Sequence, residues 1–200
     1  CPWLDLAADA CRLPIAEGAL ANLIMVDVLH HVADPGAFFA EACRVLAPGG
    51  RVILVDQAPA MLERARRELE DRVAARLEFR RGELEDLPLR PGEVDGAFVN
   101  LVLHHVPDLK GTMAELHKVL RPGGTLVVSE LVPHEEELLR EEHADLRLGL
   151  DPEKLAELAR RAGFARVRTE AGIDRYRLGG GRAGEKLLPL FLLAARKGDR

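Results

Sequence analysis

Asp56 is the residue best placed for ligand chemistry in this chain of 200 residues. It follows an aliphatic run, Val52 to Val55, that is typical of a buried strand, and a short turn then leads into a segment rich in Ala, Leu, Glu and Arg that favours a helix. An acidic side chain at the carboxyl end of a strand in a doubly wound α/β sheet can accept hydrogen bonds from both hydroxyls of a ribose. The same carboxylate could cap the helix that begins near Pro59, so its position alone leaves the two roles open.

Two Leu-His-His-Val tracts bring imidazoles together, at His30-His31 and at His104-His105. Imidazole is a common metal ligand. Adjacent side chains on an extended segment, however, point to opposite faces and make a poor chelate. No carboxylate or cysteine completes a familiar ligand pattern with either pair. We therefore expect no metal site.

An internal repeat contains both histidine tracts. Residues 9–56 (the first copy) and 83–130 (the second copy) align without a gap at an offset of 74, and sixteen of 48 positions are identical. Each copy has an apolar stretch, an amphipathic stretch, a Pro-Gly-Gly tract and another apolar stretch, which predict a strand, a helix, a helix terminator and a second strand. Two copies with so long a period do not suit a solenoid, so we interpret the repeat as one βαβ unit used twice.

The apolar stretches of both copies are continuous rather than alternating, which is typical of parallel strands covered by helices on both faces. We predict one domain over residues 1–200, with an α/β fold, a doubly wound, mainly parallel sheet and an antiparallel hairpin at its C-terminal edge. The expected strands are 22–28, 51–56, 77–80, 95–102, 124–129, 165–170 and 188–195. The expected helices are 37–46, 60–75, 112–120 and one that opens at Asp151-Pro152 and closes at Gly163, with a charged candidate lid at 133–148.

Composition and charge limit the partners. A net charge of −5 is spread over interspersed signs without a basic block, so we expect a small ligand and neither nucleic acid nor an anionic membrane. No apolar run approaches the length that spans a bilayer, and the amino terminus lacks a signal-peptide pattern. Three cysteines, Cys1, Cys11 and Cys43, cannot pair completely, which favours a reducing, cytoplasmic setting. Nothing in the sequence specifies an oligomeric state.

From Val52 to about Lys197 the chain resembles a class I S-adenosylmethionine-dependent methyltransferase of the small-molecule group called type 11. The matching motifs are VDQAPAML (55–62), GELEDLPL (82–89), VDGAFVN (94–100), LHHV (103–106) and LRPGG (120–124). They occur in the family's order over nearly three quarters of the chain. The stretch after Pro133 further resembles the tails of methyltransferase domains fused to ArsR-type regulators. The resemblance implies a Rossmann-like fold and S-adenosylmethionine as the cofactor.

The resemblance also implies roles at the adenosine end of the cofactor. Asp56 would hold the ribose, with Gln57 and Met61 flanking the adenine. Glu83 stands where the family usually has an aspartate that reaches the adenine amino group. It keeps the acceptor on a longer arm. The backbone amide of Leu84 would lie beside the ring.

The methionine end departs from the family. Asn100 matches the residue that ends the family's fourth strand near the methionine portion. The family's first strand, however, ends in a Gly-rich loop that lets the backbone approach the cofactor, and no Gly-x-Gly-x-Gly precedes Asp56. The first copy takes that place, with Asp27 for the acidic residue that usually precedes the glycines and His30 and His31 where small residues belong. We expect an impaired site at this end.

The expected function is methyl transfer from S-adenosylmethionine to a small-molecule acceptor. His105 is the catalytic candidate, as a general base that lines the acceptor pocket, although an ordinary hydrogen-bonded loop histidine explains it equally well. The alternative is a non-catalytic binding or interaction module, or a recombined scaffold, that keeps only the fold. Absence of the glycine loop favours the alternative, whereas Asp56, Glu83 and Asn100 favour the enzyme.

Overall fold

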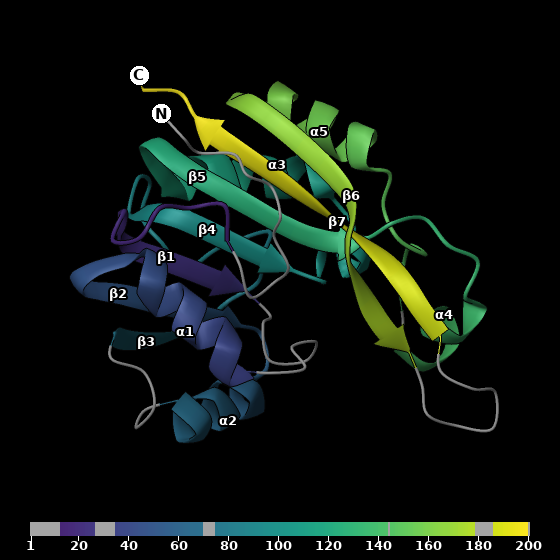
Figure 1. Cartoon of the computed structure of the whole chain (residues 1–200), viewed down its shortest axis with the longest axis horizontal. Helices are drawn as coiled ribbons and strands as arrows, with labels where there is room; N and C mark the ends of the chain where they lie inside the picture. The colour runs from purple at the N-terminus through teal and green to yellow at the C-terminus, as the bar shows by residue number, and fades with distance from the viewer. Residues whose placement is uncertain (1–12, 27–34, 70–74, 144, 179–185, 200) are drawn as a thin grey trace.

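The computed structural model of the chain describes residues 13–26, 35–69, 75–143, 145–178 and 186–199 (Figure 1). The described strands are β1 (Leu20–Val26), β2 (Leu46–Asp56), β3 (Arg76–Arg81), β4 (Val94–Asn100), β5 (Leu120–Leu131), β6 (Phe164–Leu178) and β7 (Lys186–Lys197). The described helices are α1 (Pro35–Val45), α2 (Pro59–Leu69), α3 (Leu109–Val119), α4 (Glu137–His143) and α5 (Pro152–Arg161), with one 3₁₀ turn, η1 (Leu103–His105). Among them, no helix combines the length and apolarity needed to cross a bilayer.

The strands form one sheet in the order β3-β2-β1-β4-β5-β7-β6. The first five strands pair in parallel, and β7 pairs antiparallel with both β5 and β6. This confirms the predicted mainly parallel α/β sheet with an antiparallel C-terminal hairpin. The carboxyl ends of β1 to β5 therefore meet at one edge of the sheet, which we call the carboxyl edge.

Two hydrophobic cores cover the two faces of the sheet, because alternate residues of each strand point to opposite sides. Ile24 and Ile53 belong to the core that also contains residues of α3 and α5. Leu23 and Val52, one residue earlier, belong to the core shared with α1 and α2. In Figure 1, α1 and α2 accordingly lie on the near side of the sheet, and α3 and α5 lie on the other.

The two copies of the repeat fold alike. Once the offset of 74 is applied, strand β1 and helix α1 have the same bounds as β4 and α3, and β2 matches β5 except that β5 is one residue longer at its end. Two hydrogen bonds also occur at matching positions of both copies. They join Leu13 N to Glu41 Oε1 (2.7 Å) and Leu87 N to Glu115 Oε1 (3.2 Å), and Gly18 N to Arg44 O (2.9 Å) and Gly92 N to Lys118 O (3.0 Å).

Some elements differ from the prediction. Both Pro-Gly-Gly tracts lie within the spans of β2 and β5 rather than before them, because Gly49 and Gly123 have positive φ (76° and 73°) and a register shift lets pairing begin earlier. The described residues of the predicted lid form one short helix, α4. Strands β6 and β7 are longer than predicted, because they pair with each other beyond the end of β5.

Candidate active site

Asp56 is the last residue of β2, at the carboxyl edge. Its Oδ1 accepts a hydrogen bond from the backbone N of Ala58 (2.7 Å), so the carboxylate helps to form the turn into α2. Its Oδ2 accepts no hydrogen bond from the described part of the chain. The side chain is 9% exposed. The two roles predicted for Asp56 are therefore compatible, because one oxygen stabilises the turn and the other remains for a ligand.

The other residues predicted near adenine lie beside Asp56. Asp56 is the Cα partner of Arg81 at the end of β3, and Gly82 N donates to the Asp56 carbonyl oxygen (3.2 Å). This contact holds the loop of Glu83 and Leu84 next to the end of β2. In that group Leu84 is buried, Met61 is half-buried, and Gln57 and Glu83 are exposed. The sequence therefore placed these residues at one end of the carboxyl edge.

Asn100 and Ser129 lie at the same edge. They are Cα partners at the ends of β4 and β5, and each is 1% exposed. Both polar atoms of the Asn100 amide and the Ser129 hydroxyl lack a hydrogen-bond partner within the described residues. Buried polar groups in proteins are nearly always paired, and an unpaired one costs about 1–3 kcal/mol. This pair is therefore suited to bind a polar ligand.

A strained residue follows Asn100 and directs the chain into η1. Leu101 has a φ of 50°, which non-glycine residues rarely adopt, and its N donates to the Ser129 carbonyl oxygen (2.9 Å). Such strain costs on the order of 1–3 kcal/mol and tends to occur at functional sites. The turn ends β4 and brings His104 and His105 to the carboxyl edge.

His104 is held from behind by Glu130 of β5. Its Nδ1 lies 2.8 Å from Glu130 Oε1, and its backbone N donates to Oε2 (3.3 Å). Leu131 N also donates to Oε1 (2.7 Å), and both side chains are buried. A carboxylate that accepts these bonds favours the tautomer with the ring proton on Nδ1. The other ring nitrogen, Nε2, faces Asp145.

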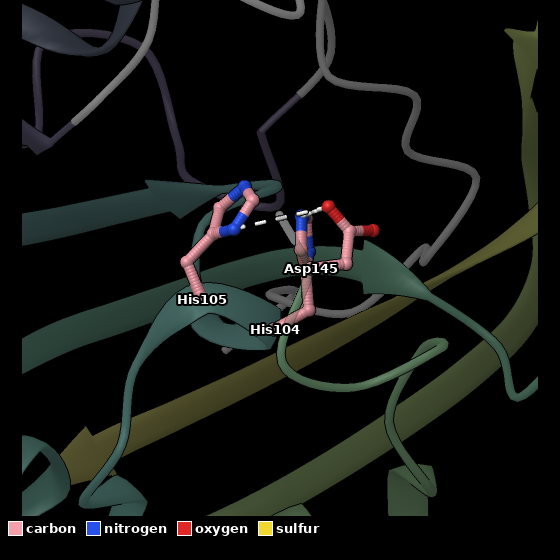
Figure 2. Close-up of side chains that lie close together, drawn as sticks. All are labelled: His104, His105 and Asp145. Carbon is pink, nitrogen blue, oxygen red and sulfur yellow. Dashed lines mark ion pairs between the residues drawn. The ribbon is translucent and has the colours of Figure 1, made fainter. Parts of the chain in front are cut away.

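Asp145 approaches both histidines from a distant part of the sequence (Figure 2). Its Oδ1 lies 3.7 Å from His104 Nε2 and 3.8 Å from His105 Nδ1. The imidazole rings are themselves 4.1 Å apart, centroid to centroid. We call His104, His105 and Asp145 the His-Asp cluster. His104 and Asp145 are buried, whereas the His105 side chain is 30% exposed, so the cluster is reached from its His105 side.

Arg147 fixes the segment that carries Asp145. Its backbone N donates to the His104 carbonyl oxygen (3.2 Å), and its guanidinium donates to the carbonyl oxygens of Val106 and Pro107. The next turn is held by Leu150 N, which donates to Leu131 O (2.8 Å). Hydrogen bonds from the Arg147 side chain and from two backbone amides therefore hold the segment that carries Asp145.

Two further groups near the cluster have shifted pKa values. Burial lowers the pKa of His134, which favours its neutral form at neutral pH. Burial raises the pKa of Tyr176, and the charge of Asp145 raises it further. Both shifts indicate a poorly solvated region around Asp145.

The two histidines of the second copy lie differently from the sequence prediction. His104 and His105 were expected on an extended segment with their side chains on opposite faces. They lie instead on the 3₁₀ turn η1, with their rings close together and a carboxylate beside them. The predicted site residue Asp27, with His30 and His31, falls outside the described residues. Of the groups that form the site, Ser129, Glu130 and Asp145 were missed. The equivalence of Glu130 with Asp56 at the offset of 74 was the available signal for Glu130.

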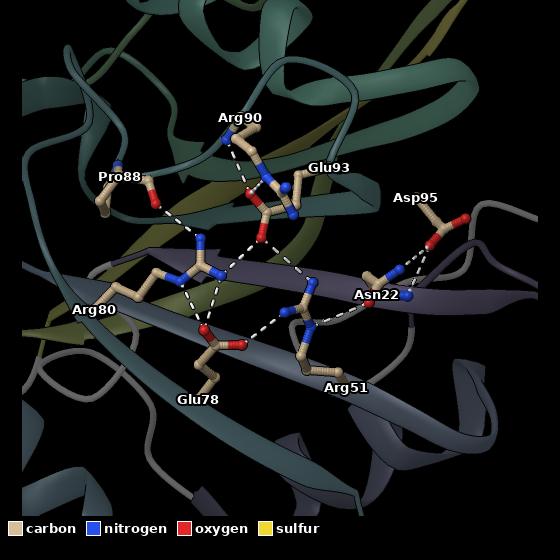
Figure 3. Close-up of polar contacts among 8 residues, drawn as sticks. All are labelled: Asn22, Arg51, Glu78, Arg80, Pro88, Arg90, Glu93 and Asp95. Atoms are coloured by element: carbon tan, nitrogen blue, oxygen red, sulfur yellow. Dashed lines mark hydrogen bonds and ion pairs between the residues drawn. The ribbon is translucent and has the colours of Figure 1, made fainter.

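A polar network near the amino ends of the strands joins the two copies (Figure 3). Arg51 of β2 donates to Asn22 Oδ1 (3.1 Å) and pairs with Glu78 of β3 (2.7 Å) and Glu93 (3.4 Å). Asn22 N and Nδ2 both donate to Asp95 Oδ2 of β4 (2.7 and 3.1 Å). These bonds fix the first copy against the second and so set the relative positions of Asp56 and Asn100.

Comparison with known proteins identifies the family. A methyltransferase domain family model matches residues 4–54 and again residues 51–128, which is more than half of the chain. The chain belongs to this methyltransferase family. The first match covers most of the first copy, and the second match begins at residue 51 and covers most of the second copy. S-adenosylmethionine is the cofactor that family membership implies.

Relatives of this methyltransferase-family chain support the assignment. The demethylmenaquinone methyltransferase of Thermus thermophilus is 37% identical over 87 residues, which cover 44% of this chain and 39% of the relative. The arsenite methyltransferase of Halobacterium salinarum is 34% identical over 91 residues, covering 46% and 23%. The chain thus spans less than half the length of these relatives. A crystal structure of a SAM-dependent methyltransferase from Aquifex aeolicus shares the fold, with a TM-score of 0.62, 17% identity and coverage of 91% and 84%.

The described residues at the carboxyl edge include a group suited to each end of the cofactor. Asp56 Oδ2 suits a ribose hydroxyl, and the unpartnered Asn100 amide suits a charged amino-acid group. β1 lies between them, and its last residue, Val26, is a Cα partner of both Val55 and Val99. Two strand spacings separate β2 from β4, about 10 Å. An elongated ligand that lies across the end of β1 can therefore contact both residues.

Proposed function

We propose that the 200 residues form one methyltransferase domain that transfers a methyl group from S-adenosylmethionine to a small-molecule acceptor. The observation that carries this proposal is the buried Asn100 amide, unpartnered within the described residues, on the same sheet edge as Asp56. An apolar residue at position 100 would serve the fold better, so a ligand explains the asparagine. The half-buried free thiol of Cys43 supports a cytoplasmic, reducing setting.

The chain's own residues would bind and orient the reactants. Asp56 and Asn100 would hold the two ends of the cofactor, with Gln57, Met61, Glu83 and Leu84 around its adenine and Asp27 near its amino-acid arm. When bound, S-adenosylmethionine supplies an electrophilic methyl group on a sulfonium, which is already a good leaving group. Catalysis then depends mainly on holding the acceptor in line and on excluding water.

His105 is the proposed general base. Its 30% exposure opens it to a small acceptor, and Asp145 beside Nδ1 stabilises the positive charge that the ring gains with a proton. His105 would take the proton that an O–H, N–H or S–H acceptor loses as its new bond to carbon forms. His104, held by Glu130, would line the same pocket as a positioning residue.

A second candidate function has one observation in its favour. No Gly-x-Gly-x-Gly tract precedes Asp56, which is where a methyltransferase backbone approaches its cofactor. A chain that keeps the fold without binding the cofactor would be a non-catalytic interaction module or a recombined scaffold.

Calorimetric titration of the full chain with adenosine and with S-adenosylhomocysteine separates the two functions. We expect both ligands to bind, with S-adenosylhomocysteine only slightly tighter, because the sequence from Asp27 to His31 that replaces the Gly-rich loop lacks its glycines (the substituted segment). If neither ligand binds, the proposed cofactor site is refuted and the chain is a non-catalytic module. A large gain from the amino-acid arm, with brisk methyl transfer, would show that the substituted segment replaces the glycine loop.

A further inference from the structure

The His-Asp cluster has the donor set of a transition-metal site. His104 Nε2, His105 Nδ1 and a carboxylate oxygen of Asp145 lie within 4.8 Å of one another. Ligand atoms that bind Zn²⁺ at about 2.1 Å in tetrahedral geometry are about 3.4 Å apart. The two nitrogen-to-oxygen distances here, 3.7 and 3.8 Å, are close to that separation. Small side-chain rotations would bring the three atoms to bonding positions.

Asp145 provides a second, independent indication. Its side chain is 2% exposed, and neither carboxylate oxygen accepts a hydrogen bond from the described part of the chain. Both distances to the histidines are too long for hydrogen bonds. Burying a carboxylate is costly unless it is paired or coordinates a metal. A cation between the three side chains would remove that cost.

Glu130 supplies the outer contact that metal-binding histidines usually have. A ligating histidine almost always donates its other ring N–H to a carboxylate, carbonyl or water, which fixes the tautomer and raises the basicity of the ligating nitrogen. The Glu130 Oε1 to His104 Nδ1 contact, at 2.8 Å, has this form, and it turns Nε2 toward Asp145. Glu130 of the buried strand β5 therefore orients His104 within the His-Asp cluster.

The geometry points to a binding site for one divalent transition-metal ion of the zinc class, held by His104 Nε2, His105 Nδ1 and Asp145. Two imidazoles and one carboxylate suit Zn²⁺ and disfavour Mg²⁺, which prefers oxygen ligands. Three protein ligands leave a fourth position, and the partly exposed His105 places it on the side open to small molecules. The binding inference is independent of the proposed methyl transfer.

The ion would change how the site treats an acceptor. A hydroxyl, thiol or amine at the fourth position would have its pKa lowered by the metal. His105 Nδ1 would then be a ligand, so the coordinated acceptor would release its proton to water instead of to the His105 ring. This consequence, unlike the binding itself, rests on the proposed function.

Metal titration of the full chain tests the site directly. The protein is treated with a chelator, desalted and titrated by calorimetry with Zn²⁺ and separately with Mg²⁺, without any cofactor. We expect one Zn²⁺ per chain and no binding of Mg²⁺. Titration with Co²⁺ should give the strong visible absorption of a four-coordinate ion, a signal that does not depend on enzymatic activity.

Substitutions locate the ion. Asp145→Asn should weaken Zn²⁺ binding more than about tenfold, while the melting temperature of the metal-free protein stays the same or rises because a buried charge is removed. His105→Gln should also weaken binding. The matched control is His117→Gln, which removes an imidazole in the last turn of α3 that packs on Phe164. It should leave binding unchanged.

Two results would overturn the inference. One is the absence of stoichiometric Zn²⁺ binding by the unsubstituted chain. The other is binding that persists at full affinity in both Asp145→Asn and His105→Gln, which would place the ion elsewhere.

Discussion

Asn100 and Ser129 face each other at the ends of β4 and β5, while the equivalent residues of the first copy, Val26 and Val55, form the same pair at the ends of β1 and β2. Both pairs are buried. The fold therefore accepts valine at these two positions, and the polar pair of the second copy is not required for packing. The difference between the copies supports the proposed ligand contact at Asn100 and Ser129.

The double substitution Asn100→Val and Ser129→Val makes this edge of the second copy like that of the first. We expect the melting temperature to stay the same or rise, because unpaired buried polar atoms are replaced by apolar ones. Binding of S-adenosylhomocysteine should fall more than about tenfold, since a lost hydrogen bond to a charged group costs about 1.5–3 kcal/mol. Thermal melting and calorimetry on the same samples measure both effects. A marked loss of stability would mean that the polar pair is structural.

Asp56→Asn and Asp56→Ala separate the two roles of that carboxylate. Asparagine retains an oxygen for the Ala58 amide, whereas alanine does not, so only alanine should destabilise the fold, by about 1 kcal/mol. Either change should weaken adenosine binding, by about 1.5–3 kcal/mol, because the charged acceptor is lost. Urea unfolding and adenosine titration provide the measurements. If the Asp56→Asn variant binds adenosine as tightly as the unsubstituted chain does, the Asp56 carboxylate acts only on the turn.

Gly149 and Gly172 form a matched pair for the loop after Asp145. Their φ values are similar, 79° and 76°, but a Cβ on Gly149 would lie 2.4 Å from the Val132 carbonyl oxygen, whereas one on Gly172 meets nothing within 4 Å. Gly172→Ala should therefore cost only the backbone strain, about 1–2 kcal/mol. Gly149→Ala should cost clearly more and should disturb the His-Asp cluster. If denaturant unfolding gave equal losses of unfolding free energy for the two variants, the loop around Gly149 would be able to adjust to the added Cβ.

Glu93 makes stability depend on acidity. Hydrogen bonding to Arg80 lowers its pKa from 4.5 to about 2, against the opposing effect of burial. Its contribution is therefore complete above pH 4.5 and is lost as the pH falls toward 2, amounting to about 3 kcal/mol at most. The free energy of unfolding should fall between pH 5 and pH 3 more steeply in the unsubstituted chain than in Glu93→Gln. Parallel curves for the two proteins would count against this role.

The sequence predicted the framework of the fold better than the site. Continuous apolar runs located four of the five parallel strands, and the short stretch from Leu77 to Arg80 located β3. Asp151, Pro152 and Gly163 correctly marked the start and end of α5. These features depend on neighbouring residues in the chain. The sequence also placed Asp56 and Asn100 at the same edge, because parallel strands that lie in one sheet end together.

The His-Asp cluster could not be predicted from local patterns. It depends on a left-handed Leu101, a conformation that leucine rarely adopts and that no local motif indicates. It also depends on a segment about 40 residues away, held by hydrogen bonds from Arg147 to the backbone around His104. Such contacts exist only after the chain has folded.

The bonds from Asn22 to Asp95 have a further consequence for a chain built from two similar copies. Strands β1 and β4 are neighbours, and the two copies fold alike, so a misfolded chain could place each copy where the other belongs. At the offset of 74, the residues equivalent to Asn22 and Asp95 are Gly96 and Ala21, which have no side chains that could form these bonds. An arrangement in which the two copies exchanged places would therefore lack these bonds, so this polar contact distinguishes the two copies and favours the assembly that the structure shows.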